Sequence, residues 1–218
     1  GAGKTTTMRM LTTLLPPTEG SAKIAGIPIG DRPRIVSNIG YLPESPPLYD
    51  ELTGFEQLSY VGHLHDVPEE TVTNRAEDWL NRFGLVDDAD RRLSTYSKGM
   101  RQKIGIVQTV LHDPDVLFLD EPTSGLDPRA ARTVIDVLAE LAESNKTIFL
   151  STHILPVVDE LADTIGVLHN GRLVAEATPS DLKRRVETGV EHTLEQVFLE
   201  LTDDDETEAI LKREHSNE

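Results

Sequence analysis

The chain opens with GAGKTTT (1–7), a run whose residue types suit the binding of phosphate groups. The phosphate-loop pattern G-x-x-x-x-G-K-[ST] ends in a glycine, a lysine and a hydroxyl residue. Gly3, Lys4 and Thr5 match these three positions, whereas the first glycine of the pattern would precede residue 1. The run is therefore either a chance match or the second half of a nucleotide-binding loop.

Two adjacent carboxylates, Asp120 and Glu121, follow the apolar run VLFL (116–119). Acidic residues are common where a strand meets a loop, so the pair alone indicates little. In phosphoryl-transfer ATPases, however, a carboxylate at such a strand end holds magnesium, and a second one can act on the attacking water. Beside a phosphate loop, the pair indicates ATP chemistry.

Strands alternating with helices would position these residues. Apolar runs predict strands at 39–43, 115–120, 147–151, 164–169 and 171–177. Helical spacing predicts helices at 5–15, 68–83, 97–111, 128–144, 154–162, 179–187 and 193–201. Thr53 and Glu56 have the spacing of a capping box that opens a further helix, and Gly26 marks a hairpin turn. Continuously apolar strands alternating with helices predict a parallel sheet covered on both faces.

Composition limits the classes of function. The 218 residues are 38% hydrophobic and 27% charged, contain no cysteine, and include no apolar run of about 18 residues. These values predict a globular, soluble protein without disulfides, thiol catalysis or thiolate metal sites.

The net charge of −17 is large for a chain of this length. Such a surface repels phosphate groups and disfavours a general role in binding nucleic acid. Two interpretations stay open. The charge is either an adaptation to a very salty cytoplasm, in which salt screens self-repulsion, or an ordinary acidic surface extended by the tail at 202–208, which we expect to be disordered.

Six motifs occur in the order known from the ATP-binding subunit of ABC transporters, and the sequence resembles that family over roughly residues 1–190. They are GAGKTTT (Walker A), YLPE (Q-loop position), YSKGMRQK (signature), VLFLDEP (Walker B), SGLD (D-loop) and STH (H-loop). The resemblance implies an α/β fold of the P-loop NTPase (ABC ATPase) type, with a mostly parallel sheet, a helical signature subdomain and an incomplete N-terminal β subdomain. The implied parts are the first part of the ATPase core (1–44), the helical subdomain (45–111), the second part of the core (112–190), and a C-terminal helix with an acidic tail (191–218).

The resemblance also implies how the phosphate loop would bind ATP. Its backbone N–H groups would wrap the β-phosphate at the positive end of the following helix. Lys4 would bridge the β- and γ-phosphates, and the Thr5 hydroxyl would be a ligand of Mg²⁺. The nucleotide-binding residues implied for this loop are Gly1, Ala2, Gly3, Lys4, Thr5 and Thr6.

The remaining motifs would complete the catalytic site. Asp120 would hold Mg²⁺ through a water molecule, and Glu44 at the Q-loop position could also approach the metal. Glu121 would be the general base, and His153 would contact the γ-phosphate and help to hold the attacking water. Asp127 would lie at the interface between two subunits and couple their sites.

The signature implies a partner subunit. Ser97 and Gly99 lie at the predicted start of a helix, where an anion is favoured. In the family this anion is the γ-phosphate of ATP bound to the opposing subunit, so that two ATP molecules are enclosed by a nucleotide-dependent dimer. A polar helix cap would explain Ser97 without a partner, but not the Lys98-Gly99 that follows.

Two positions depart from the common family pattern. The signature reads Tyr96-Ser97-Lys98-Gly99-Met100 instead of L-S-G-G-Q, and Glu44 replaces the expected glutamine. Both departures are similar to the branch that drives multidrug, sodium or polysaccharide export through a separate permease. The helix at 192–202 resembles the C-terminal helix of that branch, although an amphipathic helix without special meaning would give the same pattern.

The resemblance implies a position on the cytoplasmic face of the cell membrane. In the family, a groove of the helical subdomain receives a short helix of the permease. Apolar candidates for this contact are Leu48, Tyr49, Leu52, Phe55 and Leu58.

Two other functions stay open. One is a soluble ABC ATPase that serves no transporter, although such proteins usually carry two ATPase modules or a long coiled-coil insertion. The other is an inactive fragment, because the phosphate loop is incomplete. We expect residues upstream of Gly1 to supply the strand from which the loop hangs and the aromatic residue that stacks on adenine, and the 218 residues alone to bind ATP poorly.

Overall fold

The computed structural model describes residues 1–184 and 193–202. The chain divides into two compact units, one made of Gly1–Thr7 with Thr152–Glu218 and the other of Met8–Ser151. Helix α1 (Lys4–Leu11) begins in the former, here called the split unit, and ends in the latter, here called the continuous unit.

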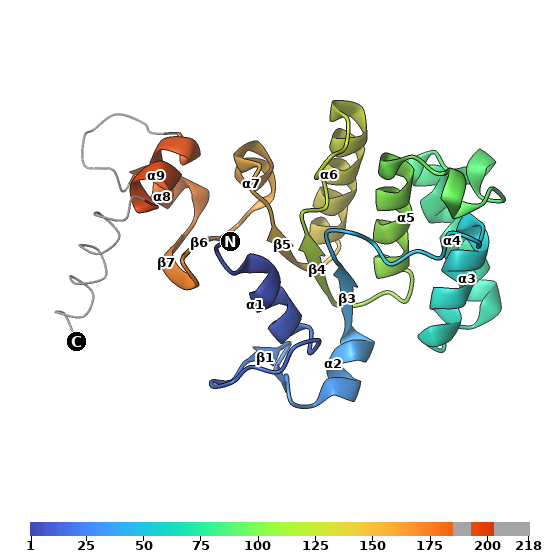
Figure 1. Cartoon of the computed structure of the whole chain (residues 1–218), viewed down its shortest axis with the longest axis horizontal. Helices are drawn as coiled ribbons and strands as arrows, with labels where there is room; N and C mark the ends of the chain where they lie inside the picture. The colour runs from blue at the N-terminus through green and yellow to red at the C-terminus, as the bar shows by residue number, and fades with distance from the viewer. Residues whose placement is uncertain (185–192, 203–218) are drawn as a thin grey trace. The chain divides into compact units, whose positions relative to one another are not determined.

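The continuous unit is built on a three-stranded parallel sheet in the order β3-β4-β5 (Figure 1). The strands are β3 (Ile39–Leu42), β4 (Val116–Asp120) and β5 (Thr147–Ser151). The register pairs Leu42 with Leu119 and Asp120 with Ser151, so the carboxyl ends of the three strands meet at one edge. All five residues of β4 are buried, as its uniformly apolar sequence predicts.

Helices and a hairpin cover this sheet. The hairpin joins β1 (Lys23–Ile24) to β2 (Ile27–Pro28) through two residues of positive φ, Ala25 and Gly26, which confirms the predicted turn. Helix α2 (Arg32–Asn38) precedes β3, and α6 (Pro128–Glu143) follows β4. One cluster of buried side chains beside the sheet consists of Ile27, Ile35, Ile39, Val116 and Phe118.

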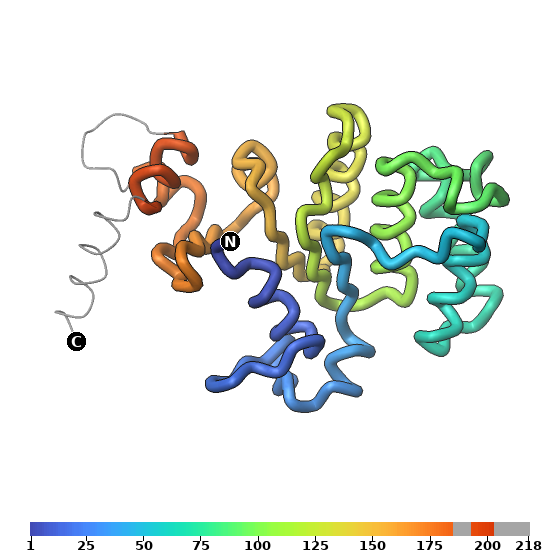
Figure 2. The backbone as a smooth tube through the Cα atoms, in the orientation of Figure 1, coloured from blue at the N-terminus to red at the C-terminus, as the bar shows by residue number. Residues whose placement is uncertain are grey.

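In the sequence, a helical segment separates β3 from β4; it forms the blue-green to green part of the backbone tube (Figure 2). It comprises α3 (Gly54–Leu64), α4 (Glu69–Phe83), two 3₁₀ turns (Val86–Asp88 and Leu93–Thr95) and α5 (Lys98–Val110). The predicted capping box opens α3, because Thr53 Oγ1 accepts from the Glu56 N–H and the Glu56 carboxylate accepts from the Thr53 N–H. Gly84, in the left-handed conformation at φ 64°, ends α4 as expected.

Two stacked histidines join this segment to the sheet. The rings of His65 and His112 lie 3.7 Å apart at an angle of 11°, and His112 Nε2 bonds to the Ile39 carbonyl oxygen at 3.0 Å. Burial, with a smaller effect of the adjacent His65, lowers the pKa of His112 to about 4. Burial also lowers the pKa of His65. Both rings are therefore neutral at pH 7, which allows them to stack without charge repulsion.

The split unit contains the antiparallel pair β6 (Ile165–His169) and β7 (Arg172–Ala177), with α7 (Leu155–Leu161), α8 (Pro179–Arg184) and α9 (Leu194–Leu201). Val167, Val174, Leu182, Leu194 and Val197 belong to its core. The predicted helix at 193–201 is confirmed, whereas the end of the one at 179–187 and the acidic tail lie outside the described residues.

Several sequence expectations were wrong in detail. Strand 164–169 forms, but it pairs antiparallel with β7 and does not join the parallel sheet of the continuous unit. Strand β5 is not covered on both faces, since Phe149 is 43% exposed. Helix α1 ends at Leu11 and not at Leu15, because Thr13 takes a positive φ. Helix α2 was missed, since its polar sequence gives no apolar period.

The described residues contain no helix that is both long enough and apolar enough to cross a bilayer.

Candidate functional site

The phosphate-loop residues lie at the start of α1, in the split unit. Gly3 has φ 104°, a conformation that favours glycine, and its carbonyl oxygen accepts the Thr7 N–H at 2.9 Å. The Ala2 carbonyl accepts the Gly171 N–H at 3.0 Å, which fixes the loop against the β6–β7 turn. The first N–H groups of a helix have no partner within that helix, so this end of α1 is suited to an anion.

Asp120 ends β4 and is 1% exposed. Its Oδ1 accepts a hydrogen bond from the Ser151 hydroxyl, at the residue that the register places opposite it on β5. Its Oδ2 is buried without a hydrogen-bond partner among the residues that the structure describes. A buried carboxylate oxygen is unfavourable without a partner, so a cation would complete this group. Ser151 belongs to the STH motif, but its contact with Asp120 could not be seen from the sequence.

The donor set fits magnesium bound together with a phosphate ligand. Among the described residues, no group of three or more His, Cys, Asp or Glu side chains could hold a metal by itself. Mg²⁺ in nucleotide sites commonly uses one or two protein oxygens, the substrate phosphates and several waters. The single unpartnered oxygen of Asp120 agrees with that pattern.

Glu121 has φ 52°, an uncommon conformation for a residue with a side chain. Its N–H donates to the Ser151 carbonyl oxygen at 2.9 Å, and its own carbonyl accepts from the Ser124 N–H at 3.0 Å. Backbone strain of this kind is found at functional sites when neighbouring contacts enforce it. Here the two backbone hydrogen bonds hold the turn that begins at Glu121, directly after Asp120.

The signature residues lie at the exposed start of α5, in the continuous unit. Ser97 is the N-cap, and its Oγ accepts the Met100 N–H at 3.2 Å. Gly99 lies beside the D-loop, because a Cβ on it would be 3.7 Å from Leu126 Cδ2. Lys98 crosses Gly125 so closely that a Cβ on Gly125 would collide with Lys98 Nζ. The sequence did not reveal this contact between signature and D-loop.

Asp127 is the exposed N-cap of α6. Its Oδ1 accepts the N–H groups of Ala130 and Arg129, both at 3.0 Å. These bonds, with that from Ala130 the stronger influence, lower the pKa of the Asp127 carboxyl. The carboxylate thus has a structural role within its own chain, and its role between subunits stays a prediction.

The other two site candidates are exposed. Glu44 follows β3 in the continuous unit, and His153 follows β5 at the start of the second part of the split unit. The continuous unit therefore carries Asp120, Glu121, the signature, Asp127 and Glu44. The split unit carries the phosphate loop and His153.

An apolar groove of about 540 Å³ lies in the continuous unit, between the helical segment and the sheet. Tyr49 and Tyr60 line it with their rings edge to face at 5.4 Å, and Leu64, which is 64% exposed, also lines it. Of the five apolar candidates for permease contact, Leu48 and Tyr49 line the groove. Leu58 is completely buried, so the suggestion that it contacts a permease is wrong.

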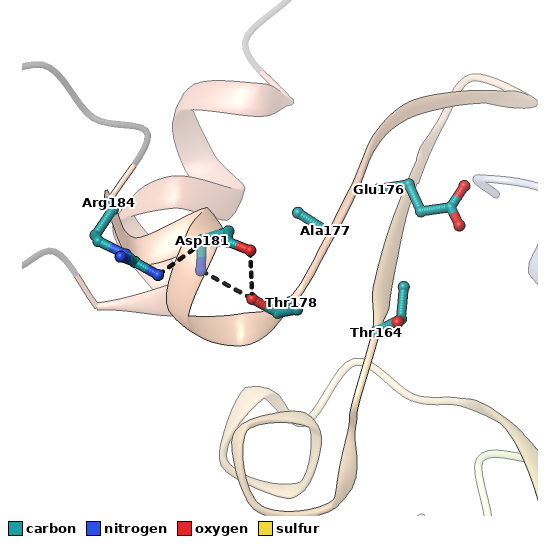
Figure 3. A pocket seen from close by; sticks show the side chains of 6 residues that line it. All are labelled: Thr164, Glu176, Ala177, Thr178, Asp181 and Arg184. Carbon is teal, nitrogen blue, oxygen red and sulfur yellow. Dashed lines mark hydrogen bonds and ion pairs between the residues drawn. The ribbon is translucent and has the colours of Figure 1, made fainter.

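A second hollow, of about 700 Å³, lies in the split unit beside α8 (Figure 3). Thr178 donates to Asp181 at 2.7 Å and accepts the Asp181 N–H at 3.1 Å, while Arg184 donates to Asp181 at 2.8 Å. These bonds cap a short helix and leave Asp181 and Arg184 paired with each other. The polar side chains beside this hollow are therefore explained by their role in capping α8, and they do not indicate a binding site.

Known proteins that are similar to this chain carry descriptions that refer to ABC transporters or to ATP binding. The family model described as ABC transporter matches residues 1–124. The daunorubicin/doxorubicin resistance ATP-binding protein DrrA of Streptomyces peucetius is 40% identical, over 87% of this chain and 58% of its own length. The ABC transporter ATP-binding protein NatA of Bacillus subtilis is 38% identical, over 80% of this chain and 72% of its own.

A solved structure described as the ATP-binding subunit of an ABC transporter is also similar. Its TM-score is 0.84 at 34% identity, and the match covers 93% of this chain and 84% of that one. The chain spans less than two thirds of the length of DrrA.

Proposed function

Because the chain belongs to the ABC transporter family as an ATP-binding subunit, we propose that it hydrolyses ATP in a nucleotide-dependent dimer and drives a separate membrane permease. One observation carries the proposal. Asp120 is buried, and its Oδ2 has no hydrogen-bond partner within residues 1–184 and 193–202; Glu121, with its left-handed backbone, follows it directly. This pair offers one carboxylate for a metal and a second for the attacking water.

Each residue of the site has one task in this proposal. The loop from Gly1 to Thr6 binds the phosphates through its backbone, and Lys4 binds the β- and γ-phosphates. Thr5 and Asp120 hold Mg²⁺, which when bound neutralises phosphate charge, and Glu44 is a further candidate ligand. Glu121 accepts a proton from the attacking water, and His153 orients the γ-phosphate.

The dimer is needed because the signature binds the nucleotide of the other subunit. The start of α5 is exposed, and Ser97 and Gly99 are accessible there. Ser97 already caps its helix through one hydroxyl lone pair, and its O–H is left to donate to a phosphate oxygen. Asp127, at the start of α6, would face the same interface.

The permease contact is assigned to the apolar groove lined by Leu48, Tyr49, Tyr60 and Leu64. Exposed aromatic and aliphatic side chains beside a cavity suit the apolar face of an amphipathic helix. The relative DrrA is named for resistance to daunorubicin and doxorubicin, and export is the direction of transport that resistance requires. We therefore propose an exporter, with this subunit on the inner face of the cell membrane.

The test is the membrane association of the full-length protein in its own cells. Wild-type protein should sediment with membranes, and Leu64→Glu should move most of it to the supernatant, because a carboxylate in an apolar groove must be desolvated to dock. Val86→Glu is the matched control, since Val86 is 45% exposed but does not line the groove. An active ATPase that never sediments with membranes would instead support a soluble function.

A further inference from the structure

Helix α5 contacts the loop after β4 at two successive turns. In its first turn, Lys98 crosses Gly125 and Gly99 approaches Leu126. In the next turn, Gln102 Nε2 donates to the Pro122 carbonyl oxygen at 3.1 Å. Helix α5, which carries the signature at its start, therefore contacts the loop that begins with Glu121 through both of its first two turns.

The Gln102 contact is buried, since this side chain is only 3% exposed. A buried amide bonded to a buried carbonyl is costly to disrupt, because the carbonyl is then left without a partner. Pro122 has no N–H of its own and follows Glu121 directly. The Gln102 bond therefore holds the chain on the carboxyl side of Glu121.

The Ser151 carbonyl holds the other side of the same residue, because it accepts the Glu121 N–H at 2.9 Å. Glu121 keeps its φ of 52° between these two anchors. Removal of either anchor would allow the backbone to relax towards an ordinary conformation and would turn the carboxylate away from its place. One anchor belongs to the sheet, and the other belongs to the signature helix.

We propose that Gln102 is a positioning residue that links occupation of the signature to the placement of Glu121. The inference rests on the proposed function. Because α5 is one continuous helix of 13 residues, a shift of its start towards a bound phosphate would also move Gln102 and the Pro122 carbonyl that it holds. Glu121 is then set for proton transfer only when a partner's nucleotide engages Ser97. No contact between Gln102 and the nucleotide is required.

The experiment compares two buried glutamines of α5. Gln102→Met keeps the side-chain length and removes the donor to Pro122. Gln108→Met is the control, because Gln108 is also buried, at 7% exposure, but bonds to Gln57 and not to the loop. We expect Gln102→Met to lower kcat for ATP by about 10- to 100-fold, as small misplacements of a catalytic group do, with KM within about twofold of wild type. Gln108→Met should leave kcat within about twofold of wild type, even if both variants lower Tm equally.

A second variant distinguishes positioning from packing. Gln102→Glu places a carboxylate against the Pro122 carbonyl at pH 8, but once protonated it can donate to that carbonyl. Burial raises the pKa of such a carboxyl. The activity of Gln102→Glu relative to wild type should therefore rise between pH 8 and pH 6, whereas that of Gln102→Met should stay constant. This variant also serves if Gln102→Met does not fold.

The rate of backbone hydrogen exchange can be measured without ATP hydrolysis. The Ser124 N–H, which donates to the Glu121 carbonyl, should exchange faster in Gln102→Met than in Gln108→Met. If kcat and exchange at Ser124 are the same in both variants, the proposal is overturned. If wild-type protein does not hydrolyse ATP but exchange at Ser124 still responds only to Gln102, the proposed function fails while the positioning contact stands.

Discussion

Replacement of Glu121 by glutamine is expected to lower ATP hydrolysis by about 10²- to 10⁴-fold while ATP still binds. The carboxylate is the proposed acceptor of a proton from the attacking water, and an amide of the same size cannot take that role. The phosphate loop, Lys4 and Asp120 are unchanged, so the affinity for ATP should be close to wild type. Phosphate release gives the rate, and calorimetry gives the affinity.

The same variant should accumulate as an ATP-bound dimer on a sizing column, because hydrolysis would no longer open it. Glu143→Gln is the control, since Glu143 is an exposed residue at the end of α6 with no place in the site. A turnover of Glu121→Gln close to that of wild type would remove Glu121 from the role of general base.

Substitution of Ser97 by arginine is expected to abolish ATP-dependent dimerisation and most hydrolysis without loss of ATP binding by the monomer. The bulky side chain would occupy the space at the start of α5 that the partner's γ-phosphate needs. The subunit's own phosphate loop is untouched. Light scattering with and without ATP measures the dimer, and binding of a fluorescent ATP analogue measures the affinity.

The control must distinguish steric exclusion of the partner's γ-phosphate from loss of a helix cap, because Ser97 also caps α5. Loss of a cap costs about 1 kcal/mol of stability. Thr193→Ala removes the equivalent cap of α9, a helix that carries no signature residue. It should lower Tm while the dimer still forms. Normal dimerisation of Ser97→Arg with ATP would contradict the trans role of the signature.

Structural features that depend only on neighbouring residues were predicted correctly from the sequence. The capping box at Thr53, the turn at Gly26 and the end of α4 at Gly84 each depend on a few neighbouring residues. The burial of β4 follows from its continuous apolar run in the same way. The order of the motifs also identified the candidate site, because each motif is short and contiguous.

Contacts between distant residues could not be predicted in this way. The bonds of Ser151 to Asp120 and of Gln102 to Pro122 join positions 31 and 20 residues apart, and only the strand register and the course of α5 bring them together. Strand β6 has the apolar sequence expected of a parallel strand, yet its partner is set by the short turn at Asn170 and Gly171, which favours a hairpin with β7. A pattern along one segment does not specify its partner.

We propose that the carboxyl end of β4 is a metal-dependent site of ATP hydrolysis. The most direct test is phosphate release by the full-length wild-type protein and by Asp120→Asn, measured against the concentration of free Mg²⁺. We expect chelation to lower wild-type turnover by at least about 100-fold. We also expect Asp120→Asn to need about tenfold more Mg²⁺ for half of its own maximal rate, because the unpartnered Oδ2 would no longer carry charge. Equal turnover with and without Mg²⁺, or the same Mg²⁺ dependence in both proteins, would contradict this proposal.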